Sequence, residues 1–206
     1  MANKKPLILV TNDDGITAPG IRALISVMKD IGNVVVVAPD SPQSAMGHAI
    51  TINDTLYCDP VKMTEDADHK EYSCSGTPAD CVKLATQEIL HRKPDLCVSG
   101  VNHGSNSSIN VIYSGTMSAA VEAGVEGIPA IGFSLLDYSL VEDFDKRKSP
   151  QGRDYYWLTG EFINEDKGED TDEWALSNGY VSVVPVQFDL TAHHFIQDLN
   201  SWELND

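Results

Sequence analysis

The first two thirds of the chain alternate short apolar runs with segments of helical periodicity. Continuous apolar runs are typical of strands buried on both faces of a sheet. Such runs lie at residues 6–11, 34–38, 96–98 and 129–134. Helices are predicted at 19–31, from Thr77 to about His91, and from Ser114 to about Gly124. The alternation predicts a doubly wound α/β core with a mostly parallel sheet.

Two regions depart from this alternation. Residues 41–75 contain short alternating runs broken by Ser, Thr, Asp and Gly, which predicts hairpins beside the main sheet. After about Leu140 the pattern weakens. It predicts loops at 141–152 and 161–173, a strand at 180–186 and a closing helix at 190–204. We therefore divide the chain into a core, residues 1–137, and a C-terminal extension, residues 138–206.

The charge of the chain restricts its partners. Fourteen Lys and Arg residues against 31 Asp and Glu residues give a net charge of −17. Nucleic-acid binding depends on neutralising phosphates with basic side chains, so a DNA or RNA partner is not expected. Neither a secretory leader nor a membrane-spanning apolar stretch is recognisable, and the four cysteines form no CxxC pair. We expect a cytoplasmic protein with reduced thiols and no membrane contact.

The end of the first predicted strand is marked by two adjacent carboxylates in Asn12-Asp13-Asp14-Gly15. In open α/β sheets, ligands bind at the carboxyl ends of the strands, near a switch in strand order. Adjacent carboxylates repel each other unless a cation holds them, and their oxygens suit Mg²⁺ or Mn²⁺. Taken alone, the same four residues are better explained by an Asx turn that leads into a helix, with Asp as the cap.

Polar residues at other strand ends favour the cation site. Ser44 follows the second predicted strand and Asn102 follows the third, so both would add neutral oxygens to those of Asp13 and Asp14. Ser114, Gly115 and Thr116 precede a predicted helix, where hydroxyls and free N–H groups bind phosphate, although a simple N-cap explains them equally well. His48 is adjacent to a glycine in its loop; it is either a substrate contact or general acid, or a loop histidine.

These residues lie within long motifs that resemble the SurE family, stationary-phase survival proteins with 5′/3′-nucleotidase activity. The motifs cover most of residues 6–135. They are ILVTNDDGITAPGI (8–21), VVVAPDSPQSAMGHAIT (35–51), SGTPADCVKLA (75–85), PDLCVSGVNHGSN (94–106) and YSGTMSAAVEAG (113–124).

The resemblance implies a Rossmann-like fold and one divalent metal ion per subunit, Mg²⁺ or Mn²⁺. The metal ligands of the family correspond to Asp13, Asp14, Ser44 and Asn102, and its phosphate-contacting loop corresponds to Ser114, Gly115 and Thr116. We expect hydrolysis of nucleoside 5′- and 3′-monophosphates, with Asp13, Asp14, Asn12 and His48 as catalytic residues. The resemblance also implies a homodimer or homotetramer that assembles through the C-terminal extension.

One difference from the family stands out. The family continues after the strand that matches residues 129–134 with a helix and a further strand, whereas here residues 135–140 run directly into 141–144. An internal segment of several dozen residues is therefore missing near residue 140, after all the expected metal ligands.

Two alternatives to the nucleotidase function remain. One is a non-catalytic nucleotide-binding protein, and the other is a phosphatase that acts on polyphosphate or sugar phosphates.

Overall fold

A single six-stranded sheet forms the centre of the molecule. The computed structural model describes residues 5–43, 46–61, 69–102, 111–135, 141–161, 168–169 and 171–187. The strands of the sheet are β1 (Leu7–Thr11), β2 (Asn33–Pro39), β3 (Cys58–Pro60), β4 (His69–Cys74), β5 (Leu96–Asn102) and β6 (Ala130–Ser134), in the order β3-β4-β2-β1-β5-β6. All neighbours are parallel except β3, which runs antiparallel to β4.

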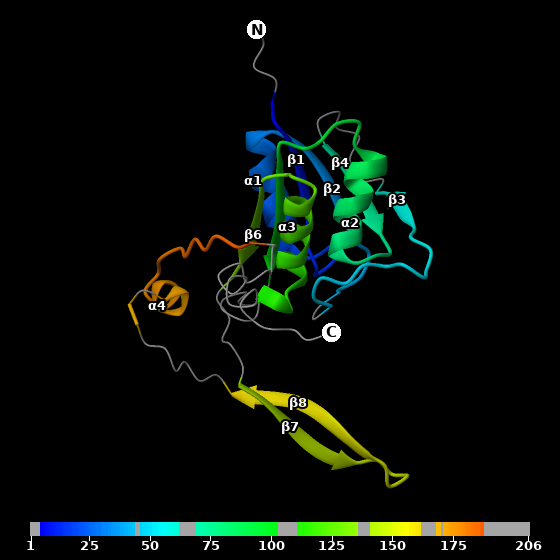
Figure 1. The fold of residues 1–206 in the computed structure, drawn as a ribbon, viewed down its shortest axis with the longest axis vertical. Helices are drawn as coiled ribbons and strands as arrows, with labels where there is room; N and C mark the ends of the chain where they lie inside the picture. The colour runs from blue at the N-terminus through cyan, green and yellow to red at the C-terminus, as the bar shows by residue number, and fades with distance from the viewer. Residues whose placement is uncertain are drawn as a thin grey trace, which may run out of the picture.

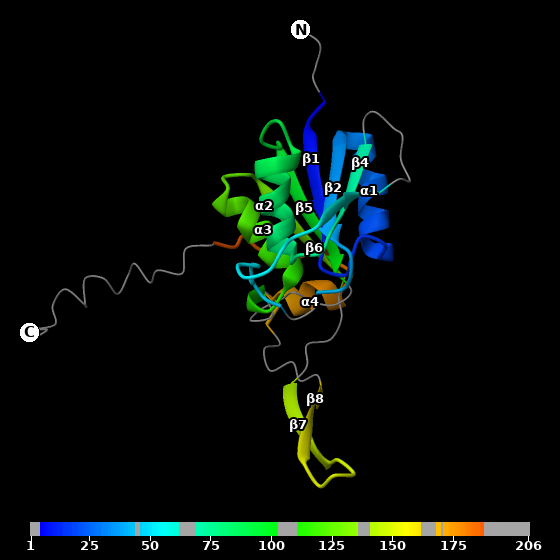
Figure 2. The same cartoon turned by 90° about the vertical axis from the view of Figure 1, so that its right-hand side faces the viewer.

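Helices cover both faces of this sheet and enclose two apolar cores (Figures 1 and 2). Helix α1 (Pro19–Ile31) packs its buried residues, Ile21 and Leu24 among them, on one face. Helices α2 (Pro78–Leu84) and α3 (Gly115–Val125) cover the other face, and a π-helical turn η1 (Ala85–Ile89) extends α2. The predicted doubly wound α/β core is therefore confirmed.

The order of the strands creates a switch point at β1. From β1 the chain moves outward through β2 to β4, and it then returns to place β5 on the other side of β1. The connections on the two sides of β1 therefore diverge, and in open α/β sheets ligands bind at the carboxyl ends of the strands that flank such a point. The turn at residues 12–15 and Asn102 lie at these two strand ends.

Residues 69–74 belong to the main sheet, so the prediction that this run forms a hairpin beside the sheet is wrong. Strand β4 pairs in parallel with β2, and only the three residues of β3 pair with it in antiparallel orientation. The buried strand β2 needs a partner on each edge to satisfy its backbone groups. Alternate burial of His69 and Glu71 allows β4 to fill that position.

The predicted loop at 141–152 is also wrong, because most of it is strand. β7 (Val141–Lys148) pairs antiparallel with β8 (Asp154–Glu161) in a separate two-stranded sheet. Lys146 Nζ lies 2.7 Å from Asp154 Oδ2 and 5.6 Å from the centre of the Tyr156 ring. Such cross-strand contacts stabilise a ribbon that has few apolar residues in β7. Figure 1 shows this hairpin projecting from the main sheet.

The rest of the C-terminal region contains helix α4 (Asp172–Ser177), which lies partly in a predicted loop. Residues 180–186 form no strand; Val181 and Val183 are exposed, and Pro185 lacks a backbone donor. The predicted helix at 190–204 lies outside the described residues. The division at residue 137 stays a prediction. Among the described helices, none has the length and apolar character needed to cross a membrane.

Candidate functional site

The turn after β1 directs two carboxylates to the switch point. Asn12 is fully buried, and its side-chain Nδ2 donates a hydrogen bond of 2.9 Å to the carbonyl oxygen of Gly15. Gly15 has a φ of +94°, a backbone conformation that residues other than glycine rarely adopt. This closed turn fixes the backbone that presents Asp13 and Asp14. This hydrogen bond is donated by the amide nitrogen of Asn12, whereas an Asx turn requires the side-chain oxygen to accept, so the alternative of an Asx turn at Asn12 is wrong.

Asp13 is buried where three elements meet. Thr116 Oγ1, from the first turn of α3, donates a short hydrogen bond to Asp13 Oδ1. The backbone N–H of Gln43, from the loop after β2, donates to the Asp13 carbonyl oxygen at 2.7 Å. A Cβ on Gly115 would lie 2.5 Å from the Asp13 Cβ, so only glycine fits at the start of α3. The structure thus brings Asp13, Gly115 and Thr116 into direct contact.

The electrostatics of this corner favour a cation. Burial raises the pKa of Asp13, the charge of Asp14 raises it further, and the hydrogen bond from Thr116 partly opposes both effects. Asp13 is 4% exposed, and none of the ion pairs between described residues includes Asp13 or Asp14. Two neighbouring carboxylates are thus held together without a basic side chain from the described part of the chain.

The remaining oxygens fit a hard divalent cation. Asn12 Oδ1 is buried and has no hydrogen-bond partner among the described residues. Asn102 ends β5, the neighbour of β1, three residues beyond the paired Thr11 and Ser99. Carboxylate, amide and hydroxyl oxygens are the ligands that Mg²⁺ and Mn²⁺ prefer. Ser44 lies outside the described residues.

The described residues form no cluster of three or more His, Cys, Asp or Glu side chains that could bind a metal. The predicted ligand set contains only two side chains of these types, Asp13 and Asp14, and it stays a prediction. A softer site built from imidazole or thiolate ligands finds no support in the described part of the chain.

The start of α3 is a helix cap, as one of the two interpretations of residues 114–116 expected, and phosphate binding there stays a prediction. Ser114 is the N-cap, and its Oγ accepts a hydrogen bond of 3.0 Å from the Met117 backbone N–H. Thr116 is fully buried and donates to Asp13. The three-residue segment is therefore a structural cap that also adjoins the acidic site, where the positive end of the helix dipole attracts anions.

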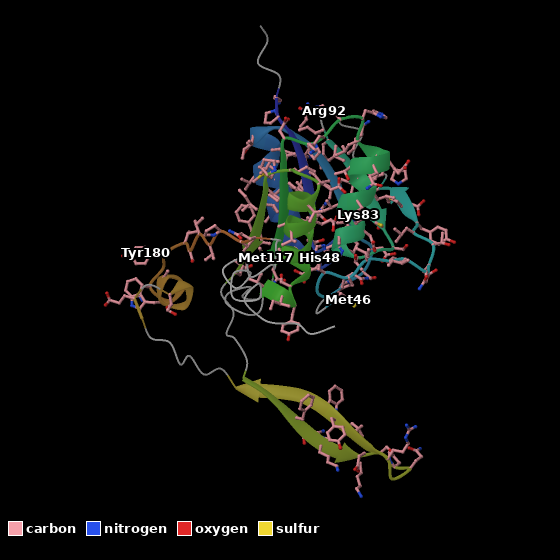
Figure 3. The ribbon with its side chains drawn as sticks, viewed as in Figure 1. Met46, His48, Lys83, Arg92, Met117 and Tyr180 are labelled. Atoms are coloured by element: carbon pink, nitrogen blue, oxygen red, sulfur yellow. The ribbon has the colours of Figure 1, made fainter. Side chains whose placement is uncertain are left out.

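His48, in the loop after β2, contacts α3 through Glu122. Its Nε2 is 2.8 Å from Oε2 of Glu122, and the second oxygen of Glu122 is 2.6 Å from Lys83 Nζ. Figure 3 shows His48 and Lys83 beside α2 and α3. Glu122 follows Gly115 by seven residues, or about 10 Å along a helix axis. His48 therefore contacts a different turn of α3 from the one that contacts Asp13.

Sequence reasoning missed Glu122. The available signal was a single acid in a helix of small and apolar residues, GTMSAAVEAGV, on the turn before the helix ends. An acid in such a helix is usually exposed, and only the packing of α2 and of the His48 loop against α3 buries it to 4% exposure.

Comparison with known proteins gives consistent matches. The profile of the family described as "Survival protein SurE" matches residues 8–158. A protein of Christiangramia forsetii named 5′-nucleotidase SurE is 64% identical over 260 residues, which cover 100% of this chain and 100% of the relative. A Bacteroides fragilis protein of the same name is 41% identical over 257 residues, covering 99% and 100%. The crystal structure of the SurE protein from Aquifex aeolicus matches with a TM-score of 0.79 at 32% identity, covering 95% of this chain and 98% of that chain.

The alignments with the two named relatives are longer than the 206 residues of this chain. These relatives therefore contain residues that this chain lacks, as the sequence motifs indicated. That the missing segment lies near residue 140 stays a prediction.

Proposed function

This chain belongs to the SurE family, and from that premise we propose that it is a metal-dependent phosphomonoesterase. Its substrates are nucleoside 5′-monophosphates, and 3′-monophosphates as well, which it hydrolyses to nucleoside and phosphate. The observation that best supports this proposal is the burial of Asp13 against Gly115 and Thr116 at the switch point of the sheet. The relatives from Christiangramia forsetii and Bacteroides fragilis are both named 5′-nucleotidases.

One divalent ion, Mg²⁺ or Mn²⁺, would be held by Asp13, Asp14, Ser44 and Asn102. When bound, such an ion polarises phosphoryl oxygens and lowers the pKa of water. The fit is supported by two adjacent carboxylates that form no ion pair with any described residue, and by the buried Asn12 Oδ1, which has no hydrogen-bond partner among those residues. A local cation is also needed because the chain has a net charge of −17, which would otherwise repel a phosphate ester.

The residues of the chain have separate tasks in this proposal. Asn12 holds the turn that orients Asp13 and Asp14 through its hydrogen bond to Gly15. Ser114, Gly115 and Thr116 bind the phosphate at the start of α3, where N–H groups face the site. Phosphoryl transfer needs positioning and charge stabilisation more than covalent chemistry, and a rigid corner of this kind supplies both. His48 contacts the substrate from the neighbouring loop.

A substrate panel tests the proposal. We expect the purified chain to release phosphate from 5′-AMP and 3′-AMP when Mn²⁺ or Mg²⁺ is present, and to release none in EDTA. Preference for glucose 6-phosphate or tripolyphosphate would instead assign a different phosphatase. Binding of AMP without turnover by the folded, metal-loaded protein would assign a non-catalytic nucleotide-binding protein.

We also propose that the protein assembles into a homodimer or homotetramer through the β7–β8 hairpin. Phe144, Tyr156 and Trp157 are each about three-fifths exposed on this ribbon. An isolated two-stranded hairpin is marginally stable in water, so a ribbon with exposed aromatic residues is better explained by contact with a second chain.

We place the enzyme in the cytoplasm. All four cysteines are free thiols, and three of them are buried. Free thiols of this kind are typical of proteins in a reducing compartment.

A further inference from the structure

Three of the four cysteines lie together where β3, β4 and α2 meet. Cys58 lies on β3, Cys74 is its direct partner on β4, and Cys81 lies on α2. Cys74 and Cys81 belong to the apolar core on this face of the sheet, and Cys58 packs against that core. β3 is an edge strand of the sheet and lies beside α2 (Figure 1). Neither the proposed metal site nor the proposed phosphate contacts use these thiols.

The ladder between β3 and β4 holds Cys58 and Cys74 at a spacing that suits a disulfide. The Ser75 backbone N–H donates to the Tyr57 carbonyl oxygen at 2.9 Å, so Cys58 and Cys74 occupy a non-hydrogen-bonded position of the antiparallel pair. Cα atoms at such a position lie about 4.5 Å apart, and a disulfide accepts about 4.4–6.8 Å. Both side chains lie on the α2 face of the sheet. The two sulfurs can therefore be joined with little movement of the backbone.

Cys74 is the member of the cluster that ionises most readily. The Cys81 thiol donates a hydrogen bond to it, and the Gly76 backbone N–H donates to its Sγ at 3.4 Å. These hydrogen bonds lower the pKa of Cys74 to about 7, although burial and two nearby carboxylates oppose them. Burial and the neighbouring Cys74 raise the pKa of Cys58 to about 11. A thiolate beside a protonated thiol is the arrangement of an attacking and a resolving cysteine.

The edge position of β3 gives small molecules a route to this pair. Cys74 is fully buried and Cys58 is half-buried. β3 has only three residues, of which Asp59 and Pro60 are exposed, and Pro60 has no N–H for the ladder. An edge strand of this length opens at a lower free-energy cost than the strands of the core. Opening admits a molecule of the size of hydrogen peroxide to Cys74, and closing returns Cys58 to the oxidised sulfur.

We propose that Cys58 and Cys74 form a reversible oxidation site for hydrogen peroxide, which converts them into a cross-strand disulfide. In the first step the Cys74 thiolate attacks one peroxide oxygen. An S–O bond forms and the O–O bond breaks, and the released hydroxide takes up the proton that Cys74 gave to solvent. In the second step the Cys58 sulfur attacks Cys74 Sγ. The S–S bond forms, the S–O bond breaks, and the departing hydroxide takes the Cys58 proton. Two thiols are thus oxidised while one peroxide is reduced to two waters.

The disulfide would add an anchor to a segment that adjoins the candidate site. The loop after β2 contains His48 and ends at β3. Asp80, on α2, already holds this loop by accepting hydrogen bonds from the Thr51 backbone N–H at 3.0 Å and from Thr51 Oγ1 at 2.6 Å. A covalent bond between β3 and β4 would also fix the end of the loop and prevent the edge strand from opening.

The test treats the reduced full-length protein with a small molar excess of hydrogen peroxide, blocks the remaining thiols with iodoacetamide and maps disulfides by peptide mass spectrometry. We expect the loss of two of the four thiols, a Cys58–Cys74 disulfide, and recovery of all four thiols in dithiothreitol. Cys58→Ser should lose the disulfide and carry a sulfenic acid at Cys74 instead, which dimedone traps. Cys97→Ala, which removes a buried thiol on β5, is the matched control and should oxidise like wild type.

A wild-type protein that keeps all four thiols, or that joins Cys74 to Cys81 instead, would overturn the inference. Disulfide formation in Cys58→Ser at the wild-type rate would do the same. Cys58 is half-buried at the edge of the sheet, and circular dichroism checks that Cys58→Ser keeps the fold. The measurements contain no nucleotide and no metal, so their outcome is independent of the proposed phosphatase activity.

Discussion

At the scale of single residues, the site depends on the missing side chain of Gly115. The first turn of α3 approaches Asp13 so closely that a Cβ would lie 2.5 Å from the Asp13 Cβ and 2.9 Å from its Oδ2. This approach lets the Thr116 hydroxyl reach Asp13. Any larger residue at position 115 must displace either the carboxylate or the start of the helix.

Gly115→Ala should therefore lower kcat by about a hundredfold, because a displacement of about 1 Å at a catalytic group has effects of that size. Gly32→Ala is the matched control: its Cβ would lie 2.4 Å from the Pro6 carbonyl oxygen, which is equally tight but lies at the amino end of the strands. Both variants should lose about 2 kcal/mol of unfolding free energy from overpacking. Normal kcat in folded Gly115→Ala would contradict the proposed role of this contact.

The sequence predicted where some residues of the candidate site lie, but it did not predict the contacts of others. Asp13, Asp14 and Asn102 were predicted because parallel strands deliver their carboxyl ends to one edge of a sheet. Their proposed roles as ligands remain predictions. Glu122 was missed because its burial depends on three elements that meet only in the folded chain. The contact between Thr116 and Asp13 was missed for the same reason, because these residues are 103 positions apart in the sequence and meet only in the folded chain.

At the scale of secondary-structure elements, an ion cluster joins α1 to β4. The Arg22 guanidinium donates to both oxygens of Glu71, at 3.2 and 2.8 Å, and His69 Nε2 lies 2.5 Å from Glu71 Oε1. Burial alone would raise the pKa of Glu71, but the hydrogen bonds from Arg22 and His69 outweigh it and hold the pKa below its usual value. A lowered pKa contributes stability above the ordinary carboxyl pKa, and that stability is lost as the pH falls through the folded-state value.

Glu71→Gln should lower the unfolding free energy by about 2 kcal/mol near neutral pH, because it leaves Arg22 without a charged partner. The difference from wild type should shrink as the pH falls through the lowered pKa of Glu71 in the folded protein, because the wild-type side chain then becomes protonated as well. Urea unfolding of both proteins over a range of acidic pH values and at neutral pH measures this. Asp154→Asn, which breaks the exposed pair with Lys146, should cost less than about 1 kcal/mol. A Glu71→Gln penalty that does not change with pH would contradict the electrostatic explanation.

Strands and helices were predicted correctly where apolar residues repeat with a strong period. They were missed where a strand forms through pairing with another strand instead. The strands and helices between Leu7 and Ser134 were largely predicted because their buried faces leave a repeating pattern. β7 has a charged sequence, VEDFDKRK, and forms a strand through cross-strand partners on β8 that no local pattern reveals. The segment at 180–186 has the apolar composition of a strand but no ladder partner among the described residues.

At the scale of the whole molecule, the hairpin distinguishes the C-terminal region from the core. It extends away from the main sheet in both views (Figures 1 and 2) and exposes Phe144, Tyr155, Tyr156 and Trp157. The net charge of −17 disfavours nonspecific association. The exposed aromatic residues of the hairpin are therefore the basis of the proposed contact between two copies of the chain.

Trp157→Lys should therefore reduce the mass of the assembly, because a charge in the centre of an aromatic interface is costly to bury. Sedimentation velocity measures the change, and circular dichroism checks that the fold is retained. Tyr57→Lys, at another aromatic residue that is 66% exposed on the core, should leave the mass unchanged. An unaltered assembly in Trp157→Lys would show that the hairpin is not the interface.

The most direct test of the proposed metal site is AMP hydrolysis as a function of Mn²⁺ concentration in wild type, Asp13→Asn and the exposed control Asp59→Asn. We expect EDTA-treated wild type and Asp59→Asn both to recover activity as Mn²⁺ is added. Asp13→Asn should stay at least about a hundredfold less active at every concentration, because the buried carboxylate is the centre of the proposed cation site. Full turnover by Asp13→Asn at saturating Mn²⁺ would show that the Asp13 carboxylate is not needed to bind a catalytic metal ion.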